Sequence, residues 1–394
     1  MKNLLKFIIA SGFLINVVYA QSDYKILHNQ SLVVDMHTDV LLHVLLGSDL
    51  SKRLDYGHVD LVRLKEGGVD VQFFAIWPNP NLYGQGGMFD QSIRLIDSLD
   101  DLVENNPDKI ILTRTPVEVE GAVHTGKIAA CVGVEGGTAI ENDLTKLKTL
   151  YDRGARYLCL TWNDSPDWAS SARDEIVNKS EIKPGLSEFG RDVIRWMNEH
   201  GMIIDVSHCG EQTFWDVIEE STKPIIASHS CAYNLCPHYR NLKDNQIRAI
   251  GKNNGVIFLN FYPGYLARGF DQKYTVLIES STVFLDSMKM VYGTNQLGFQ
   301  AYRNHYLRQK SDNFRPDVGI IVDHMDYIID LIGDDHVGLG SDFDGISILP
   351  KGIEDASKMP EITRVMMERG YSNQRIKKIL GGNFMRIFRA VSDL

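Results

Sequence analysis

Eight short apolar runs recur along the chain and constrain its fold more than any other feature. They cover residues 31–37, 69–77, 127–136, 156–162, 202–208, 224–230, 255–261 and 336–344. Segments with the helical spacing of apolar residues lie between them, at 92–106, 144–154, 188–201, 212–222 and 245–255. Several of these segments end in glycine, as helices commonly do. Nearly continuous apolar strands that alternate with helices indicate parallel strands covered by helices.

Eight strands of this kind predict a closed (β/α)8 barrel of the TIM type, an α/β fold that residues 21–394 would form as one domain. The alternative is an open doubly wound sheet, which usually carries a glycine-rich phosphate-binding turn after its first strand. Here the first strand runs into HTDVLLH at 37–43, which contains no glycine. The sequence therefore favours the barrel.

One segment exceeds what a minimal barrel needs. Residues 263–316 separate the seventh apolar run from a helical segment at 318–333, and part of this segment also has helical spacing. Long insertions between barrel elements tend to be functional or interfacial. We therefore expect a lid or a dimer-forming element after the seventh strand, not a second domain, and we expect the protein to be a homodimer.

The first 20 residues have the layout of a secretory signal peptide. A basic start with Lys2 and Lys6 precedes an apolar stretch that ends in Val-Tyr-Ala at 18–20, which predicts cleavage after Ala20. The alternative is an uncleaved anchor, but the apolar stretch is shorter than the roughly 20 residues that a spanning helix needs. We expect an exported protein, periplasmic or extracellular, without a transmembrane anchor after cleavage.

Composition limits the classes of partner. The chain has 394 residues, of which 44% are hydrophobic and 23% charged, so it can build a large core. Its net charge is −10 and it has no basic run, so we expect no nucleic-acid partner. Five cysteines are an odd number for an exported protein, and we interpret them as small buried residues. A disulfide between Cys231 and Cys236 is the alternative.

The apolar runs end in residue types that bind metals. On a strand, residues two apart point to the same face. His37 and Asp39, at the end of the first run, would therefore project together. In a (β/α)8 barrel these carboxyl-terminal strand ends build the active site, and histidine and carboxylate ligands suit zinc. Three histidines and two acids exceed what one catalytic zinc needs, which favours two metals that share a carboxylate. In chain order the residues at these ends are His37, Asp39, Glu135, His208, His229 and Asp342.

These residues lie in motifs that resemble the membrane (renal) dipeptidase family of the metal-dependent amidohydrolase superfamily. The resemblance runs from about residue 31 to the C-terminus and covers residues 263–316 poorly. The motifs that carry it are DMHTDV at 35–40, GVEGG at 133–137, DVSH at 205–208, ASHS at 227–230, HYRN at 238–241, NFY at 260–262 and GLGSDFDG at 338–345.

The resemblance implies two zinc ions per chain. One would be held by His37, Asp39 and Glu135, and the other by Glu135, His208 and His229, so that Glu135 bridges them. It also implies that a hydroxide bridging the two ions is the nucleophile.

The resemblance further implies roles in proton transfer and substrate binding. Asp342 would take the proton of the nucleophile and deliver it to the leaving amine, a task that needs a carboxylate close to the reacting water. Arg240 would hold the C-terminal carboxylate of the substrate, for which a two-pronged guanidinium is suited. Tyr262, just past the seventh strand, would line the same pocket; the alternative is that it is a packing residue.

The chain departs from the family pattern after the fourth strand. The family usually has a histidine there, in the context LTH, which helps to stabilise the tetrahedral intermediate, whereas this chain has Trp162. An indole donates one hydrogen bond and cannot carry a proton or a positive charge. We expect Asn163 to replace that histidine as the donor, with Asp164 as an alternative, and Trp162 to form an apolar wall. If nothing replaces the histidine, the enzyme should be slow.

We therefore predict an exported dizinc dipeptidase that hydrolyses the peptide bond of dipeptides. One alternative is a related amidohydrolase that acts on N-acyl amino acids or on a phosphoester. Another is a metal-stabilised barrel that binds peptides without turnover. Arg240 favours a substrate with a free carboxylate, and Asp342 argues against a mere binder, which needs no proton shuttle.

Overall fold

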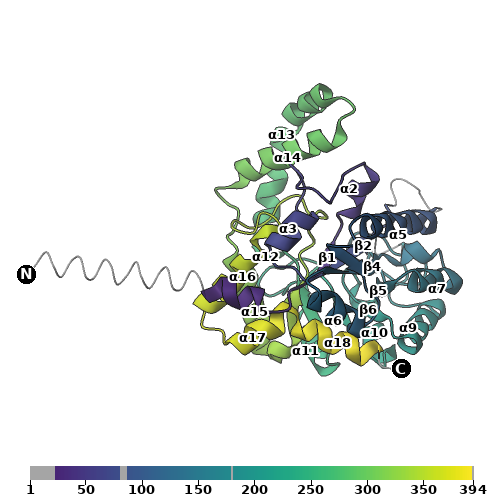
Figure 1. Ribbon diagram of the computed structural model, residues 1–394. Coiled ribbons are helices and arrows are strands. Elements are labelled where there is room, and N and C mark those ends of the chain that lie inside the picture. The colour runs from purple at the N-terminus through teal and green to yellow at the C-terminus, as the bar shows by residue number, and fades with distance from the viewer. Residues whose placement is uncertain (1–22, 80–86, 179–180, 393–394) are drawn as a thin grey trace, which may run out of the picture.

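A ring of eight parallel strands lies at the centre of the molecule, and the predicted (β/α)8 barrel is confirmed (Figure 1). The structure, a computed structural model, describes residues 23–79, 87–178 and 181–392. The predicted signal peptide, residues 1–20, lies outside the described residues. Each barrel strand coincides with one of the eight apolar runs. Their bounds are β1 (Val34–Thr38), β2 (Val71–Ile76), β4 (Ile128–Glu135), β5 (Ala155–Cys159), β6 (Ile203–Asp205), β7 (Ile226–Ala227), β8 (Val256–Leu259) and β9 (Val337–Leu339).

The first and last barrel strands meet in a closing seam made of Asp35, Thr38, Ser341 and Phe343. Thr38 and Phe343 form an isolated parallel bridge. The Asp35 carboxylate accepts hydrogen bonds from the backbone N–H and the hydroxyl of Ser341, at 2.8 and 2.7 Å. Asp35 is fully buried, and these bonds offset the cost of burying its polar atoms. The seam places the residues after β1 beside those after β9.

A ninth strand, β3 (Ile110–Leu112), lies outside the ring and was not expected from the sequence. It pairs in parallel with residues 128–130 of β4. Residues 132–135 of β4 pair with β5 instead. Only Ile110 of its three residues is buried, so the continuous apolar signal of a barrel strand is missing.

Two layers of apolar side chains hold the barrel together. Every residue of the eight barrel strands is buried. One face of the strands packs against the surrounding helices in the larger core cluster. Alternate positions, such as Phe73 and Cys131, form a second cluster that fills the barrel together with Phe384 and Phe388. This filled interior is a packed core, so the strand ends are left for chemistry.

The helical segments expected from the sequence are present around the ring. In α9, Ser187 caps the start by accepting from the Gly190 N–H, and Gly201 ends the helix in a left-handed conformation. The longer helices are α5 (Met88–Asn105), α6 (Pro116–His124), α7 (Leu144–Asp152), α9 (Glu188–His200), α10 (Glu211–Glu220), α11 (Asp244–Lys252), α15 (Gly319–Ile332), α16 (Pro360–Glu368) and α18 (Asn383–Ser392). Shorter helices and turns are α2 (Leu41–Leu45), α3 (Leu61–Glu66), α8 (Asp174–Val177), α17 (Asn373–Lys377), η1 (Gly137–Ile140), η2 (Asp334–His336), η3 (Ala356–Lys358) and η4 (Lys378–Gly382).

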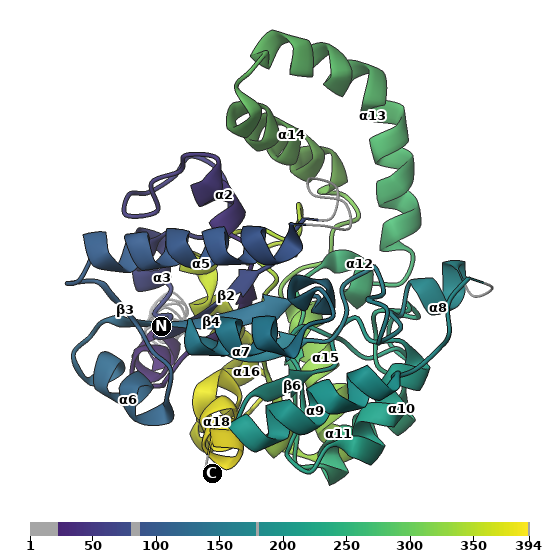
Figure 2. The same ribbon diagram turned by 90° about the vertical axis from the view of Figure 1, so that its right-hand side faces the viewer.

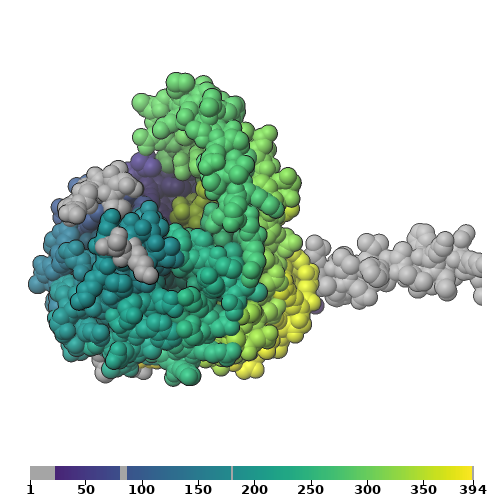
Figure 3. Space-filling model, turned by 180° about the vertical axis from the view of Figure 1, so that it is seen from behind, coloured from purple at the N-terminus to yellow at the C-terminus, as the bar shows by residue number. Residues whose placement is uncertain are grey.

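The insertion after the seventh barrel strand, β8, forms a helical hairpin. It consists of α12 (Pro263–Leu266), α13 (Phe270–Tyr292) and α14 (Gln296–Ser311). The α13–α14 hairpin stands out from the barrel, at the end opposite to α18 (Figures 1 and 2). A small apolar cluster that includes Phe270, Leu307 and Ile348 ties its base to the segment after β9. In the space-filling view a hollow opens between the hairpin and the barrel (Figure 3). Its role as a lid or dimer element stays a prediction.

The cysteines follow the sequence-based interpretation. All five are buried and none forms a disulfide, so Cys231 and Cys236 are not paired. Within residues 23–79, 87–178 and 181–392, no helix has both the length and the apolar character that crossing a membrane requires.

Candidate metal centre and active site

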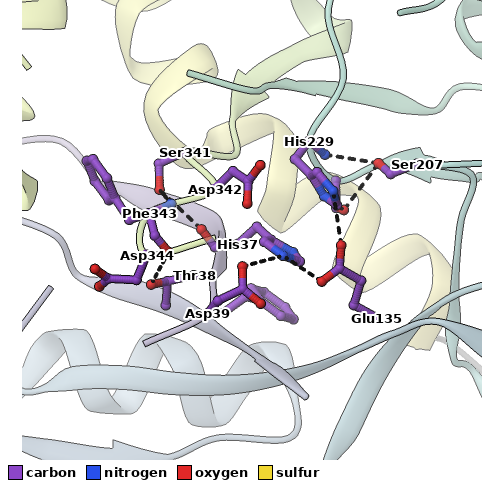
Figure 4. Close-up of polar contacts among 12 residues, drawn as sticks. His37, Thr38, Asp39, Glu135, Ser207, His229, Ser341, Asp342, Phe343 and Asp344 are labelled. Carbon is purple, nitrogen blue, oxygen red and sulfur yellow. Dashed lines mark hydrogen bonds and ion pairs between the residues drawn. The ribbon is translucent and has the colours of Figure 1, made fainter. Parts of the chain in front are cut away.

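The carboxyl ends of the barrel strands bring the predicted metal ligands together, as Figure 4 shows for four of the five. β1 contains His37, β4 ends at Glu135, and the other ligands lie in the short segments that follow β1, β6 and β7. All five side chains are buried, with at most 7% of any of these residues exposed. They are His37, Asp39, Glu135, His208 and His229.

The two carboxylate oxygens of Glu135 face different histidines. Oε2 lies 3.4 Å from Nε2 of His37, while Oε1 lies 3.0 Å from Nε2 of His208 and 3.4 Å from Nε2 of His229. Nε2 of His37 also lies 3.5 Å from Oδ2 of Asp39. Glu135 is therefore placed between two groups of ligands.

The donor atoms fit a metal better than they fit one another. His208 and His229 point their Nε2 atoms at each other across 2.9 Å, and the Nε2 atom of His37 is buried without a hydrogen-bond partner among the described residues. Ligands that each lie about 2.0–2.1 Å from a tetrahedral zinc ion are separated by roughly 3.4 Å. The separations around Glu135 are close to this value. The donor set, three imidazoles and two carboxylates, is one that zinc prefers.

Buried hydroxyl groups orient two of the histidine rings. Nδ1 of His37 lies 2.9 Å from the hydroxyl of Tyr157, which itself donates to the backbone carbonyl of Met36. Nδ1 of His229 lies 2.7 Å from the hydroxyl of Ser228, which donates to the buried carboxylate of Asp205. In both pairs the hydroxyl proton is directed elsewhere, so the imidazole donates its Nδ1–H. Each Nε2 then keeps its lone pair for a metal.

His208 is held differently. Its Nδ1 atom is buried and has no hydrogen-bond partner within the part of the chain that the structure describes. Its backbone instead adopts a left-handed conformation, with φ of 65°, and Asp342 does the same with φ of 61°. Non-glycine residues rarely adopt this conformation, and where they do the strain is often associated with function.

The charge states of Glu135, His208 and His229 suit metal binding. Burial alone would lower the pKa of His37, but Tyr157 and the nearby carboxylates raise that pKa well above its usual range, so a metal would have to displace a proton from this ring. Burial alone would raise the pKa of Glu135, but the surrounding histidines, His37 foremost, hold that pKa well below its usual range. Burial, assisted by the positive charge of Arg240, lowers the pKa of His208 to about 3. Burial and the proximity of His37 also hold the pKa of His229 well below its usual range. The carboxylate is thus ionised and these two imidazoles are neutral, which are the forms that coordinate metals.

Asp342 lies beside the ligand cluster. Its carboxylate, with the donor atoms of His37 and Asp39, forms a group whose atoms all lie within 4.8 Å of one another. Burial, reinforced by the nearby acids although His37 opposes them, raises the pKa of Asp342 to about 8. Asn260 donates its side-chain amide to Oδ2 of Asp342 at 2.8 Å. A Cβ atom on Gly345 would lie 2.1 Å from Asp39 and 2.3 Å from Asp342, so only glycine lets the chain pass so close to both.

Arg240 is a buried cation that has no matching anion among the described residues. It is 4% exposed, and no described carboxylate lies within ion-pair distance of it. One of its Nη atoms donates to the backbone carbonyl of His229 at 3.2 Å, and its Nε has no partner among the described residues. The guanidinium lies over the ring of Tyr265 at 5.5 Å. A buried unpaired charge is costly, so this arrangement is suited to an incoming anion.

Two cavities meet at His208. The arginine cavity, of about 530 Å³, is lined by Arg240 and His208 among others. The tryptophan cavity, of about 240 Å³, is lined by Glu135, Asp342, Trp77, Trp162, Asn163, Tyr265 and others. Trp162 and Asn163 thus lie beside the ligand cluster. Tyr265 lines this cavity, whereas Tyr262 contacts Tyr265 and packs at the base of the hairpin.

Several supporting residues were not singled out from the sequence. Tyr157 lies inside an apolar strand, where nothing distinguishes it from a packing residue. Asp205, Ser228 and Asn260 belong to motifs noted above, but their roles depend on contacts between strands. Trp77 ends the second apolar run. Because the carboxyl ends of barrel strands build the active site, its position could have indicated a site residue, as the position of His37 did.

A sequence profile of the membrane dipeptidase family, peptidase family M19, matches residues 21–394. The chain belongs to this family. It is 31% identical over 345 residues to the dipeptidase tcpJ of Claviceps purpurea (strain 20.1), a match that covers 86% of this chain and 70% of that protein. The protein is therefore a metallopeptidase of the dipeptidase type.

Solved structures agree with this assignment. The probable dipeptidase PvdM of Pseudomonas aeruginosa is 25% identical, with a TM-score of 0.80 over 95% of this chain and 98% of its own. Dipeptidase AC, a metallopeptidase of family M19, is 25% identical, with a TM-score of 0.73 over 92% and 99%. A metallopeptidase of Rhodobacter sphaeroides, solved with a phosphinate mimic of the dipeptide L-Ala-D-Ala, is 25% identical, with a TM-score of 0.72 over 92% and 99%.

Proposed function

We propose that this membrane dipeptidase family member is an exported enzyme that binds two zinc ions and hydrolyses dipeptides with a free C-terminal carboxylate. The observation that carries the proposal is Arg240, a buried cation that has no anionic partner in the described part of the chain and is hydrogen-bonded to the backbone of the predicted ligand His229. A substrate carboxylate would neutralise this charge and place the adjacent peptide bond at the ligand cluster. The dipeptide mimic bound by the Rhodobacter sphaeroides relative is a molecule of the same class.

Glu135 would bridge the two metal sites through its two oxygens. His37 and Asp39 would complete one site, and His208 and His229 the other. When bound, the metals would activate the attacking water and polarise the scissile carbonyl.

The remaining steps fall to side chains of this chain. Asp342 would accept the proton of the attacking water and pass it to the leaving amine, because it lies against the ligand cluster and Asn260 fixes its orientation. Asn163 would donate a hydrogen bond to the oxygen of the tetrahedral intermediate, because it lines the tryptophan cavity next to Glu135.

A substrate panel tests this proposal. Purified protein would be assayed with dipeptides, N-acyl amino acids and phosphoesters, with zinc added and with a chelator. We expect zinc-dependent release of free amino acids from dipeptides alone. Turnover of acyl amino acids or phosphoesters in preference to dipeptides would indicate the related amidohydrolase. Binding of dipeptides without turnover would indicate a peptide-binding barrel.

Two substitutions test how the missing histidine is replaced. If Asn163 is the donor, Asn163→Ala should lower kcat by roughly 10²–10³, and Trp162→His should bring no gain. A harmless Asn163→Ala, together with a faster Trp162→His enzyme, would show that nothing had replaced the histidine.

Association and export complete the proposal. The hairpin exposes apolar side chains to solvent, with Val283 84% and Met290 78% exposed, and this surface is where we would expect a homodimer contact. Sedimentation of the purified protein measures its mass. Sequencing the N-terminus of the secreted protein checks cleavage after Ala20.

A further inference from the structure

Two tryptophans, Trp77 and Trp162, form an aromatic wall of the tryptophan cavity. Binding of metals by the ligand cluster does not require this wall. Trp77 follows β2, Trp162 follows β5, and their rings lie 4.8 Å apart at 50°. Both indoles are half-buried, and both line the cavity. Leu42 and Ile346 add aliphatic surface. Among the described residues no hydrogen bond joins these side chains to a predicted metal ligand, although the ring of Trp162 lies 6.4 Å from that of His208. Their main contribution is therefore apolar contact surface.

Trp77 presents carbon rather than a hydrogen-bond donor to the cavity. Its Nε1 atom is buried and has no partner among the described residues, so it is not accessible to a molecule in the cavity. Paired aromatic rings with accessible faces bind other aromatic rings by stacked or edge-to-face contact. The wall therefore matches a large apolar group better than a polar one.

The charges around the two cavities fix the direction in which a dipeptide lies. The arginine cavity contains the unpaired guanidinium of Arg240. The tryptophan cavity meets the arginine cavity at His208, and its described lining includes no lysine or arginine. A dipeptide carries a cation at its N-terminus and an anion at its C-terminus. Its C-terminal residue would therefore lie in the arginine cavity, and its N-terminal residue would pass His208 into the tryptophan cavity.

We propose that Trp77 and Trp162 form the subsite for the N-terminal side chain and select dipeptides whose first residue is aromatic or large and aliphatic. This inference rests on the proposed dipeptidase function. It assigns to Trp162 a role in substrate choice, where the family pattern has a histidine. The cavity, of about 240 Å³, has room for a large side chain.

The test compares matched substrates. The ratio of kcat/KM for Phe-Gly to that for Ala-Gly measures selection at the first residue, and the ratio for Gly-Phe to Gly-Ala measures selection at the second. We expect the zinc-loaded wild type to prefer Phe-Gly. Trp162→Ala and Trp77→Ala should each lower the first ratio by on the order of tenfold and leave the second ratio unchanged.

Matched variants separate selection from general damage. Trp196→Ala removes a half-buried indole that stacks on His200 in α9, away from both cavities, and it should leave both ratios at the wild-type values. Trp162→Phe keeps an aromatic face and should retain most of the preference, which provides a reading if Trp162→Ala folds poorly. Zinc content and thermal melting of each variant establish that it is folded.

Each outcome supports or refutes the proposed subsite. If the wild type cleaves dipeptides but the Trp162 and Trp77 variants lower Phe-Gly and Ala-Gly equally, the subsite is refuted and the proposed function stands. A change confined to the Gly-Phe ratio would place the wall at the second residue and also refute it. If the zinc-loaded wild type cleaves no dipeptide, the proposed function fails and the subsite with it.

Discussion

The site at the carboxyl ends of the barrel strands and the α13–α14 hairpin differ in how deeply their side chains are buried. At the site, every predicted metal ligand is buried, and the hydroxyl of Ser228 is hydrogen-bonded to the carboxylate of Asp205 and to the ring of His229. On the hairpin, apolar side chains such as Val276 and Val283 face solvent, at 63% and 84% exposure. We therefore expect the barrel to hold the site without the hairpin, and the outer face of the hairpin to serve association. Paired substitutions, one in each region, test this division.

The largest difference is expected from the bridging carboxylate. Glu135→Gln should remove both metals, because both sites share this residue, and activity should fall by on the order of 10³-fold or more. The same change on the hairpin, Glu279→Gln, should alter neither the metal content nor the activity. Elemental analysis and dipeptide turnover measure both effects. A single tightly bound ion that is indifferent to Glu135 would contradict the bridged site.

The next effect concerns substrate charge. Arg240→Ala should lower kcat/KM for free dipeptides. The loss should correspond to about 2–5 kcal/mol of transition-state stabilisation, the usual effect of leaving a buried charge unmatched. Arg303→Ala, on the hairpin, is the control and should have little effect. C-terminally amidated dipeptides should already be poor substrates of the wild type. Equal turnover of amidated and free dipeptides would remove Arg240 from substrate binding.

A smaller effect should follow from loss of the hydroxyl behind His229. Ser228→Ala removes the acceptor for the His229 Nδ1–H, and loss of such outer contacts typically weakens metal binding by about 10–100-fold. Chelator competition measures zinc affinity, and melting of the metal-free protein measures folding separately. Ser280→Ala on the hairpin should change neither quantity. If the zinc affinity of the Ser228→Ala protein equals that of the wild type, Ser228 does not position the ligand.

The smallest effect on folding and catalysis should come from the hairpin itself. Val283→Asp places a charge at an exposed position, where substitutions usually change the free energy of unfolding by less than about 0.5 kcal/mol. Turnover should be unchanged, while a dimer held by this face should dissociate to monomers in sedimentation. Lost turnover without a change in mass would show that the hairpin contributes to the site, and the division between the two regions would fail.

The sequence predicted those features that leave a local pattern. Strands buried on both faces give continuous apolar runs, so all eight barrel strands were found, whereas β3 buries only Ile110 and was missed. The metal-binding residue types stand out because they interrupt apolar runs at one defined place. Tyr157 and Asp205 act through partners on neighbouring strands, and no spacing along the chain encodes such contacts. The direction in which the hairpin leaves the barrel depends on packing between Phe270, Leu307 and the distant Ile348.

The closing seam has a consequence for biosynthesis. A ribosome completes β1, with His37 and Asp39, some three hundred residues before it reaches Asp342. Until Ser341 is made, the Asp35 carboxylate has only the hydrogen bond from Gln72 and lacks the two from Ser341 that it accepts in the folded barrel, so burying it would be less favourable. A nascent or prematurely terminated chain that lacks β9 therefore cannot close the ring, nor bring Asp342 beside His37 and Asp39. We therefore expect hydrolytic activity only after almost the whole polypeptide has been translated.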